Sequence, residues 1–152
     1  MLEGLPDAGY VVRTAWLYGR HGRSFVGTML RLAEEGGAVD VVDDAYGQPT
    51  WTRPLAARLV DLGLAALAGS ARPQVYHCAA AGQASRYELA RAVFALAGFD
   101  PARVRPTSSA HAARPARRPA YSVLGHERWA AAGLPPMEHW RDMLAQAMER
   151  WR

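Results

Sequence analysis

Lysine is absent from the 152-residue sequence, in which all 18 basic residues are arginines. A site that pairs a tyrosine with a lysine, so that the cation lowers the pKa of the phenol, needs both side chains. Such a site is therefore excluded for these residues alone, whatever fold they adopt.

Cysteine is almost absent as well, since Cys78 stands alone in the apolar stretch VYHCAAA. A single thiol excludes an internal disulfide and offers no second sulfur for a metal site. We expect Cys78 to be a small core residue. No metal site is expected, because the five histidines lack the spacing of ligands. They are His21, His77, His111, His126 and His139.

The sequence also lacks a long hydrophobic run, although half of its residues are hydrophobic. No stretch reaches the roughly 20 apolar residues that a membrane helix needs. The N-terminus also has neither the basic region nor the apolar region of a secretory leader. We expect one globular domain over residues 1–152, located in the cytoplasm, with no membrane partner.

The formal net charge of +4 raises the question of an anionic partner. Nucleic acid is one candidate, favoured by the arginines Arg114, Arg117 and Arg118. The sequence has no aromatic residues placed among these arginines, and it has no helix-turn-helix pattern or zinc finger. We therefore expect no nucleic-acid partner. Solvated surface charge is the simpler interpretation for most single arginines.

Short β-branched runs alternate with amphipathic stretches along the chain. Ser24 and Thr52 are expected N-caps, and Ser85 with Glu88 has the spacing of a capping box. In the second helix the residues expected on one apolar face are Leu55, Leu59, Leu62 and Leu67. Strands are expected at 10–14, 38–42, 75–79 and 103–106, and helices at 24–36, 52–69, 85–98 and 137–151. The alternation favours an α/β or α+β domain with a small sheet.

Five segments resemble, in order and spacing, the C-terminal part of the dTDP-4-dehydrorhamnose reductases, members of the extended short-chain dehydrogenase/reductase superfamily. The segments are VRTAWLYG (12–19) with SFVGTMLRLA (24–33), VDDAYGQPT (42–50), VYH (75–77) with GQASRYELA (82–90), RPAYSVL (118–124), and GLPP (133–136) with the closing helix. The sequence departs from the family pattern at Ala45, Arg86 and Tyr121. These departures bear on individual substrate contacts.

The resemblance implies an α/β fold, namely the C-terminal part of an NAD(P)-binding Rossmann-like enzyme with a small sheet and about five helices. It implies NADPH- or NADH-dependent reduction of dTDP-4-dehydro-β-L-rhamnose to dTDP-β-L-rhamnose. The Gly-rich turn that would hold the cofactor pyrophosphate is not found among the 14 glycines. We therefore expect a chain that lacks the N-terminal Gly-rich βαβ unit and is inactive alone, with no catalytic residue of its own.

The resemblance also assigns roles to five residues. Trp16 would pack on the deoxysugar, because an indole face suits its apolar C–H groups. Thr14 and Ala15 would touch the nicotinamide end of the cofactor. Arg118 would bind the substrate diphosphate through a planar guanidinium, and Thr50 would lie at the nucleotide end. The simpler alternatives are a core tryptophan, ordinary strand residues, surface charge and a tight turn.

Expected partners are the dTDP-sugar and either a second copy in a homodimer or a separate N-terminal half. The alternative function is a non-catalytic sugar-nucleotide-binding or regulatory module of the same superfamily. Binding of dTDP-rhamnose would favour a module over an inert fragment.

Overall fold

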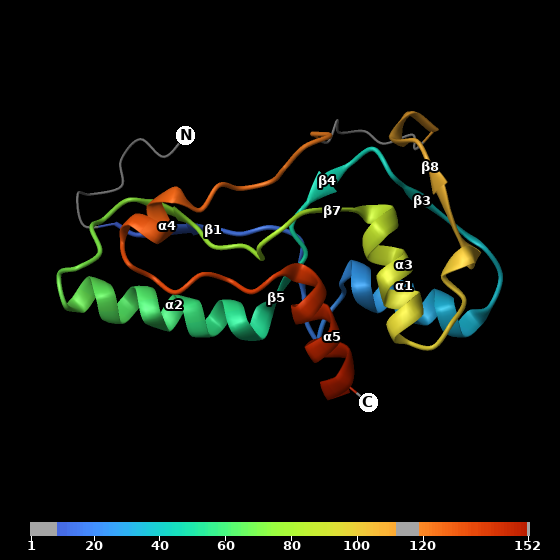
Figure 1. The fold of residues 1–152 in the computed structure, drawn as a ribbon, viewed down its shortest axis with the longest axis horizontal. Coiled ribbons are helices and arrows are strands. Elements are labelled where there is room, and N and C mark those ends of the chain that lie inside the picture. The colour runs from blue at the N-terminus through green and yellow to red at the C-terminus, as the bar shows by residue number, and fades with distance from the viewer. Residues whose placement is uncertain (1–8, 112–118, 152) are drawn as a thin grey trace.

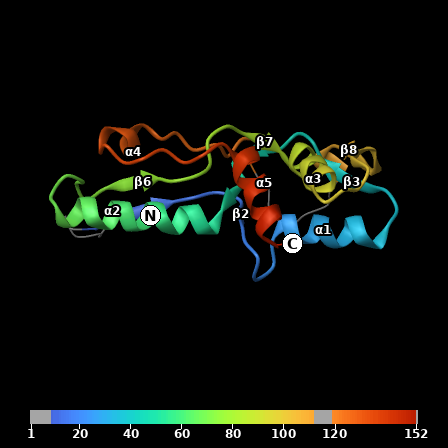
Figure 2. The same ribbon diagram turned by 60° about the horizontal axis from the view of Figure 1, so that its bottom comes forward.

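The computed structural model describes residues 9–111 and 119–151. The molecule is elongated (Figure 1), with two groups of elements side by side along its long axis. The helices α2 (Thr52–Leu67) and α4 (Glu127–Ala131) belong to one group, and α1 (Phe25–Glu35) and α3 (Arg86–Leu96) to the other. The closing helix α5 (Trp140–Trp151) lies between the two groups in both views (Figure 2).

The described strands form four separate pairs. Three pairs are parallel: β1 (Val11–Arg13) with β6 (Val75–His77), β2 (Leu17–Tyr18) with β5 (Thr50–Trp51), and β3 (Val39–Val42) with β8 (Val104–Thr107). The fourth, β4 (Tyr46–Gly47) with β7 (Ala84–Ser85), is antiparallel. Two short 3-10 helices, Pro101–Arg103 and Ser109–His111, flank β8. The expected α/β class with five α-helices is confirmed, but two-stranded pairs replace one small sheet.

Two of the three expected helix caps are confirmed. The side chain of Ser24 accepts a hydrogen bond from the backbone N–H of Gly27 at the start of α1. At α3 the capping box is complete, because Ser85 Oγ accepts from Glu88 N and the Glu88 carboxylate accepts from Ser85 N. These caps satisfy N–H groups that have no partner within the helix.

The second helix differs from the sequence prediction in two respects. Trp51, with no side-chain cap, precedes α2, and Thr52 is its first helical residue. Leu55 and Leu62 are buried, whereas Leu59 and Leu67 are 42% and 88% exposed. Positions 55 and 62 are two turns apart on one face, whereas position 67 is turned well away from that face and its side chain is exposed.

The core joins both groups of elements through α5. Trp140, Met143, Leu144 and Ala147 on this helix are each at most 1% exposed, as their spacing predicts. Cys78 is 1% exposed, which confirms it as a core residue. None of the helices over residues 9–111 and 119–151 has the length and hydropathy needed to cross a membrane.

Candidate functional site

A cleft of about 2010 Å³ runs between the end of β1, the start of α1, β3 and the segment 119–124. Three of the predicted site residues, Thr14, Ala15 and Trp16, lie together on its wall. The other lining side chains include Phe25, Met29, Val41 and Arg86. The cleft therefore combines an apolar wall with a few charged side chains of both signs, a composition common in sites for small molecules.

Trp16 is held in an uncommon backbone conformation where β1 ends. Its φ of +43° lies in the left-handed region, which few residues other than glycine adopt. Its carbonyl accepts a hydrogen bond from the N–H of Thr50 at 3.2 Å, and its indole packs against Gly47. Strained residues of this kind are concentrated at functional sites, because the surrounding structure must enforce them.

Arg86, the first residue of α3, covers the indole of Trp16. Its guanidinium carbon lies 3.6 Å from the centroid of the Trp16 ring and 4.8 Å from that of Phe25. The expected stacking of a deoxysugar on Trp16 therefore stays a prediction, and it must accommodate this cation. From the sequence, Arg86 was identified only as a departure from the family pattern, and that departure was the available signal.

Thr14, the residue after β1, carries a polar atom that has no hydrogen-bond partner among the described residues. Its Oγ1 is buried and makes no hydrogen bond within residues 9–111 and 119–151. A buried hydroxyl without a partner is costly, so it is suited to an amide or hydroxyl group outside the described residues. This geometry fits the predicted nicotinamide contact of Thr14 and Ala15, which stays a prediction.

Thr50 does not line the cleft. It is fully buried, and its hydroxyl donates to the carbonyl of Gln48 at 3.0 Å and accepts from the N–H of Ala80 at 3.1 Å. Its observed role is to join β5 to the segment after β6. The contact with substrate expected from the sequence stays a prediction that would require this hydroxyl to be uncovered.

The carboxylates of the cleft have partners within the chain. Asp40 pairs with Arg105 at 2.9 Å. Asp44 accepts hydrogen bonds from Ser108 Oγ at 2.7 Å and from the N–H and Oγ of Ser109. These bonds hold the pKa of Asp44 below its ordinary value, the bond from Ser108 contributing most.

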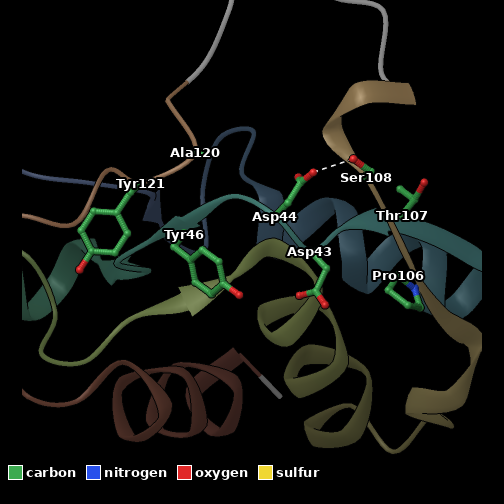
Figure 3. Close-up of a pocket in the computed structure, with 8 residues that line it drawn as sticks. All are labelled: Asp43, Asp44, Tyr46, Pro106, Thr107, Ser108, Ala120 and Tyr121. Atoms are coloured by element: carbon green, nitrogen blue, oxygen red, sulfur yellow. Dashed lines mark hydrogen bonds between the residues drawn. The ribbon is translucent and has the colours of Figure 1, made fainter.

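A smaller hollow of about 690 Å³ lies beside the cleft (Figure 3). It shares Asp44, Thr107, Ser108 and Ala120 with the cleft, and Tyr46 and Tyr121 also line it. The phenol of Tyr121 donates to Gln83 Oε1 at 3.0 Å. The hollow is thus an extension of the cleft along β4.

The segment 119–124 is tied to β4 and the residue after it. Backbone hydrogen bonds link Tyr46 to Ala120 and Ser122, and the amide of Gln48 bonds both the N–H and the carbonyl of Leu124. Pro119 lines the cleft. Arg118, the predicted diphosphate ligand, lies outside the described residues. Within the described ranges no group of three or more His, Cys, Asp or Glu side chains could hold a metal ion.

The sequence is similar to dTDP-4-dehydrorhamnose reductases over nearly all of its own length. It is 56% identical over 147 residues to a dTDP-4-dehydrorhamnose reductase of Streptomyces griseus, covering 97% of this chain and 48% of that protein. It is 50% identical over 149 residues to the dTDP-4-dehydrorhamnose reductase of Mycobacterium tuberculosis, with 97% and 47% covered. The chain spans about half the length of these relatives.

The fold matches a solved structure of the same kind. A dTDP-4-dehydrorhamnose reductase (rfbD) from Bacillus anthracis in complex with NADP superposes with a TM-score of 0.85 at 32% identity. The match covers 93% of this chain and 48% of that one. The model of one protein family, the RmlD substrate binding domain, matches residues 4–152, and the chain therefore belongs to this family.

Proposed function

We propose that this chain supplies sugar-nucleotide recognition to an NADPH-dependent dTDP-4-dehydrorhamnose reductase. The observation that carries the proposal is the cleft that places Thr14, Ala15 and Trp16 on one wall, in a chain of the RmlD substrate binding domain family. The substrate would be dTDP-4-dehydro-β-L-rhamnose and the product dTDP-β-L-rhamnose. Both the B. anthracis complex with NADP and the names of the relatives support this assignment.

The residues of the chain would bind and orient rather than transfer a proton. NADPH, when bound, supplies the hydride. Trp16 and the apolar residues Phe25 and Met29 would hold the sugar nucleotide and exclude water from it. Thr14 Oγ1 would donate to or accept from a polar group beside the reacting carbonyl. A lysine that tunes a tyrosine must come from outside these 152 residues, which contain none.

The proposed partner is a dinucleotide-binding part, in the same or a separate chain. Within the described residues β1 pairs only with β6, and parallel strands occur in larger sheets covered on both faces. The other edge of β1, which pairs with no strand among residues 9–111 and 119–151, would continue such a sheet. Residues exposed on α2, among them Val60, Leu64 and Leu67, would face this partner.

Calorimetric titration of the 152-residue chain with dTDP-rhamnose tests the recognition role. We expect saturable binding with a micromolar dissociation constant. A Trp16→Ala variant should bind more weakly, because the indole supplies much of the contact area. Absence of heat with dTDP-rhamnose at millimolar concentration contradicts the proposal.

Enzyme assays test the reductase assignment separately. We expect no NADPH-dependent reduction of dTDP-4-dehydrorhamnose by the purified chain. Reduction should be observed in a chimera that joins the upstream half of the S. griseus relative to residues 1–152. Turnover by the unaltered chain would contradict the expectation.

A non-catalytic sugar-nucleotide-binding module is the second candidate, because the cleft and the family assignment concern recognition of a ligand and would serve it without turnover. It predicts that the chain binds dTDP-rhamnose but that the chimera does not reduce the substrate. The two functions therefore give opposite results in the same assay.

A further inference from the structure

The rim of the cleft after β8 is held by a single carboxylate, that of Asp44. This rim consists of Ser108, Ser109 and Ala110, which follow β8 and all line the cleft. Ser108 Oγ donates a hydrogen bond to Asp44 Oδ2 at 2.7 Å (Figure 3). The backbone N–H of Ser109 donates to both carboxylate oxygens, at 3.0 and 2.9 Å, and Ser109 Oγ donates to Oδ2 at 3.1 Å. One side chain therefore accepts from two successive residues of the rim.

The hydrogen bonds continue from Asp44 to the third residue of the rim. Ser108 Oγ also accepts a hydrogen bond from the N–H of Ala110 at 3.2 Å. Because Ser109–His111 is a short 3-10 helix, its first N–H groups have no acceptor within the helix. Asp44 and Ser108 supply acceptors for two of them, as capping side chains do in longer helices. The backbone path of the rim thus depends on the carboxylate of Asp44.

A second part of the rim is fastened to the same stretch of chain. The N–H of Tyr46 donates to the carbonyl of Ala120 at 2.7 Å, and the N–H and Oγ of Ser122 donate to the carbonyl of Tyr46 at 3.0 and 2.9 Å. Ala120 and Ser122 line the cleft as well. Asp44 and Tyr46 are two positions apart in the sequence, so the anchors of both parts of the rim are neighbours. Loss of the anchor at Asp44 therefore changes how one part of the rim lies relative to the other.

The exposure of these bonds indicates that they serve geometry more than stability. Asp44, Ser109 and Ala110 are exposed, and polar interactions at an exposed surface contribute little to the free energy of unfolding, because water replaces a lost partner. A carboxylate on the wall of a cleft for an anionic ligand also opposes binding by its charge. Its presence there needs another reason, which the bonds to the rim supply.

We propose that Asp44 is a positioning residue of the cleft, which holds residues 108–110 in the arrangement that meets the sugar nucleotide. The inference rests on the proposed function for the nature of the ligand. Asp44 acts through Ser108 and Ser109 and not by contact with the ligand, since both of its oxygens are already engaged. Without the carboxylate the rim has the binding arrangement in only a fraction of the molecules, and the affinity falls by that fraction.

Calorimetry with dTDP-rhamnose on the full 152-residue chain tests this role. We expect Asp44→Ala to weaken binding by about 3- to 10-fold, which corresponds to a rim correctly placed in about a third to a tenth of the molecules. Asp44→Asn removes the same charge but keeps one acceptor oxygen, so its affinity should lie between those of Asp44→Ala and wild type. The melting temperature of each variant should change by less than about 2 °C, because the lost bonds are exposed.

A double variant separates positioning from an independent contact with the ligand. Ser108→Ala removes the hydroxyl that links Asp44 to the N–H of Ala110. The double variant Asp44→Ala, Ser108→Ala should bind at most about 2-fold more weakly than Asp44→Ala, because both changes break the same set of bonds. Losses that multiply in the double variant show two separate contacts and overturn the inference.

Glu35→Ala is the matched control, because Glu35 is an exposed carboxylate that pairs with Arg31 outside the cleft. It should leave the affinity unchanged. Unchanged or tighter binding by Asp44→Ala overturns the inference, and so do equal affinities of Asp44→Ala and Asp44→Asn, since the charge then matters and the acceptor does not. A larger fall in melting temperature indicates a structural role and overturns it too. These outcomes leave the proposed function intact, whereas absence of binding by the unaltered chain ends both.

Discussion

The backbone of Gly47 lies directly against the indole of Trp16, so that a Cβ atom at position 47 would overlap Cε2, Cζ2 and Nε1 of the ring. This contact joins β4 to the loop after β1 and sets the position of Trp16 in the cleft. It also explains why the turn carries glycine there, since any other side chain would displace the ring.

Gly47→Ala should therefore lower both stability and nucleotide binding. The added methyl group overpacks a buried contact, for which we expect a loss of about 1–3 kcal/mol in the free energy of unfolding. Thermal unfolding followed by circular dichroism measures it. Gly63→Ala is the control, since Gly63 is in the exposed part of α2 with no atom near its Cβ position. It should be neutral or stabilise by up to about 1 kcal/mol.

Leu62→Ala and Leu67→Ala should have very different effects, although both leucines were expected on one apolar face. Leu62 is 4% exposed and Leu67 is 88% exposed. We expect a loss of about 2–5 kcal/mol for the first and a change within about 0.5 kcal/mol for the second. Urea unfolding curves give both values. Similar losses would show that the outer face of α2 is covered in solution.

Ser85→Ala should destabilise the protein more than Ser24→Ala. Both serines cap a helix, a contribution of about 1 kcal/mol each. Ser85 is fully buried and its hydroxyl also donates to Asp43 at 2.6 Å, so its removal leaves a carboxylate oxygen without that donor. Denaturation midpoints of the two variants provide the comparison, and a reversed order would contradict the role of the Asp43 bond.

Thr50→Val tests the structural role of the buried hydroxyl. The variant keeps the shape but leaves the N–H of Ala80 without its acceptor, for which we expect a loss of about 1–3 kcal/mol. Thr28→Val, at an exposed position of α1, should cost less. If Thr50→Val instead keeps full stability and loses only affinity for dTDP-rhamnose, the substrate contact predicted from the sequence is supported.

The thiol of Cys78 should give stability a dependence on alkaline pH. Burial raises its pKa to about 12, against about 8.5 for an exposed thiol. Above pH 8.5 the unfolded chain loses the proton that the folded chain retains, so stability falls as the pH rises toward 12. Unfolding curves across this range measure the slope, and Cys78→Ala should remove this component of it. A thiol reagent at pH 8 should label Cys78 only as fast as the protein opens.

Local patterns predicted α1, α2, α3 and α5, because their signals lie within a few residues, whereas the short helix α4 was not predicted. Ser24 and the Ser85–Glu88 pair each marked a helix start that the structure confirms. The period of apolar residues in α5 likewise identified its buried face. The end of β1 was predicted near Thr14, and the family resemblance then placed Thr14, Ala15 and Trp16 at a site just beyond it.

The surroundings of the site could not be predicted in the same way. Arg86 is 70 positions from Trp16 in the sequence, and only the packing of α3 against α1 brings the guanidinium onto the indole. Thr50 looked like part of a ligand-binding turn, but β2 and the segment at Ala80 cover it. Burial depends on which elements meet, and a motif does not contain this information.

The sequence by itself determined that these residues lack a tyrosine–lysine pair, that they alternate between strands and helices, and that five ordered segments resemble one reductase family. Composition and short-range periodicity are sufficient for the first two conclusions, and the third rests on the resemblance of the segments to that family. Only the tertiary structure decided which face of α2 is buried, that Thr50 is covered and that Arg86 lies on Trp16. Each of these depends on contacts between residues distant in the chain, whose energies are set by the packing of whole elements.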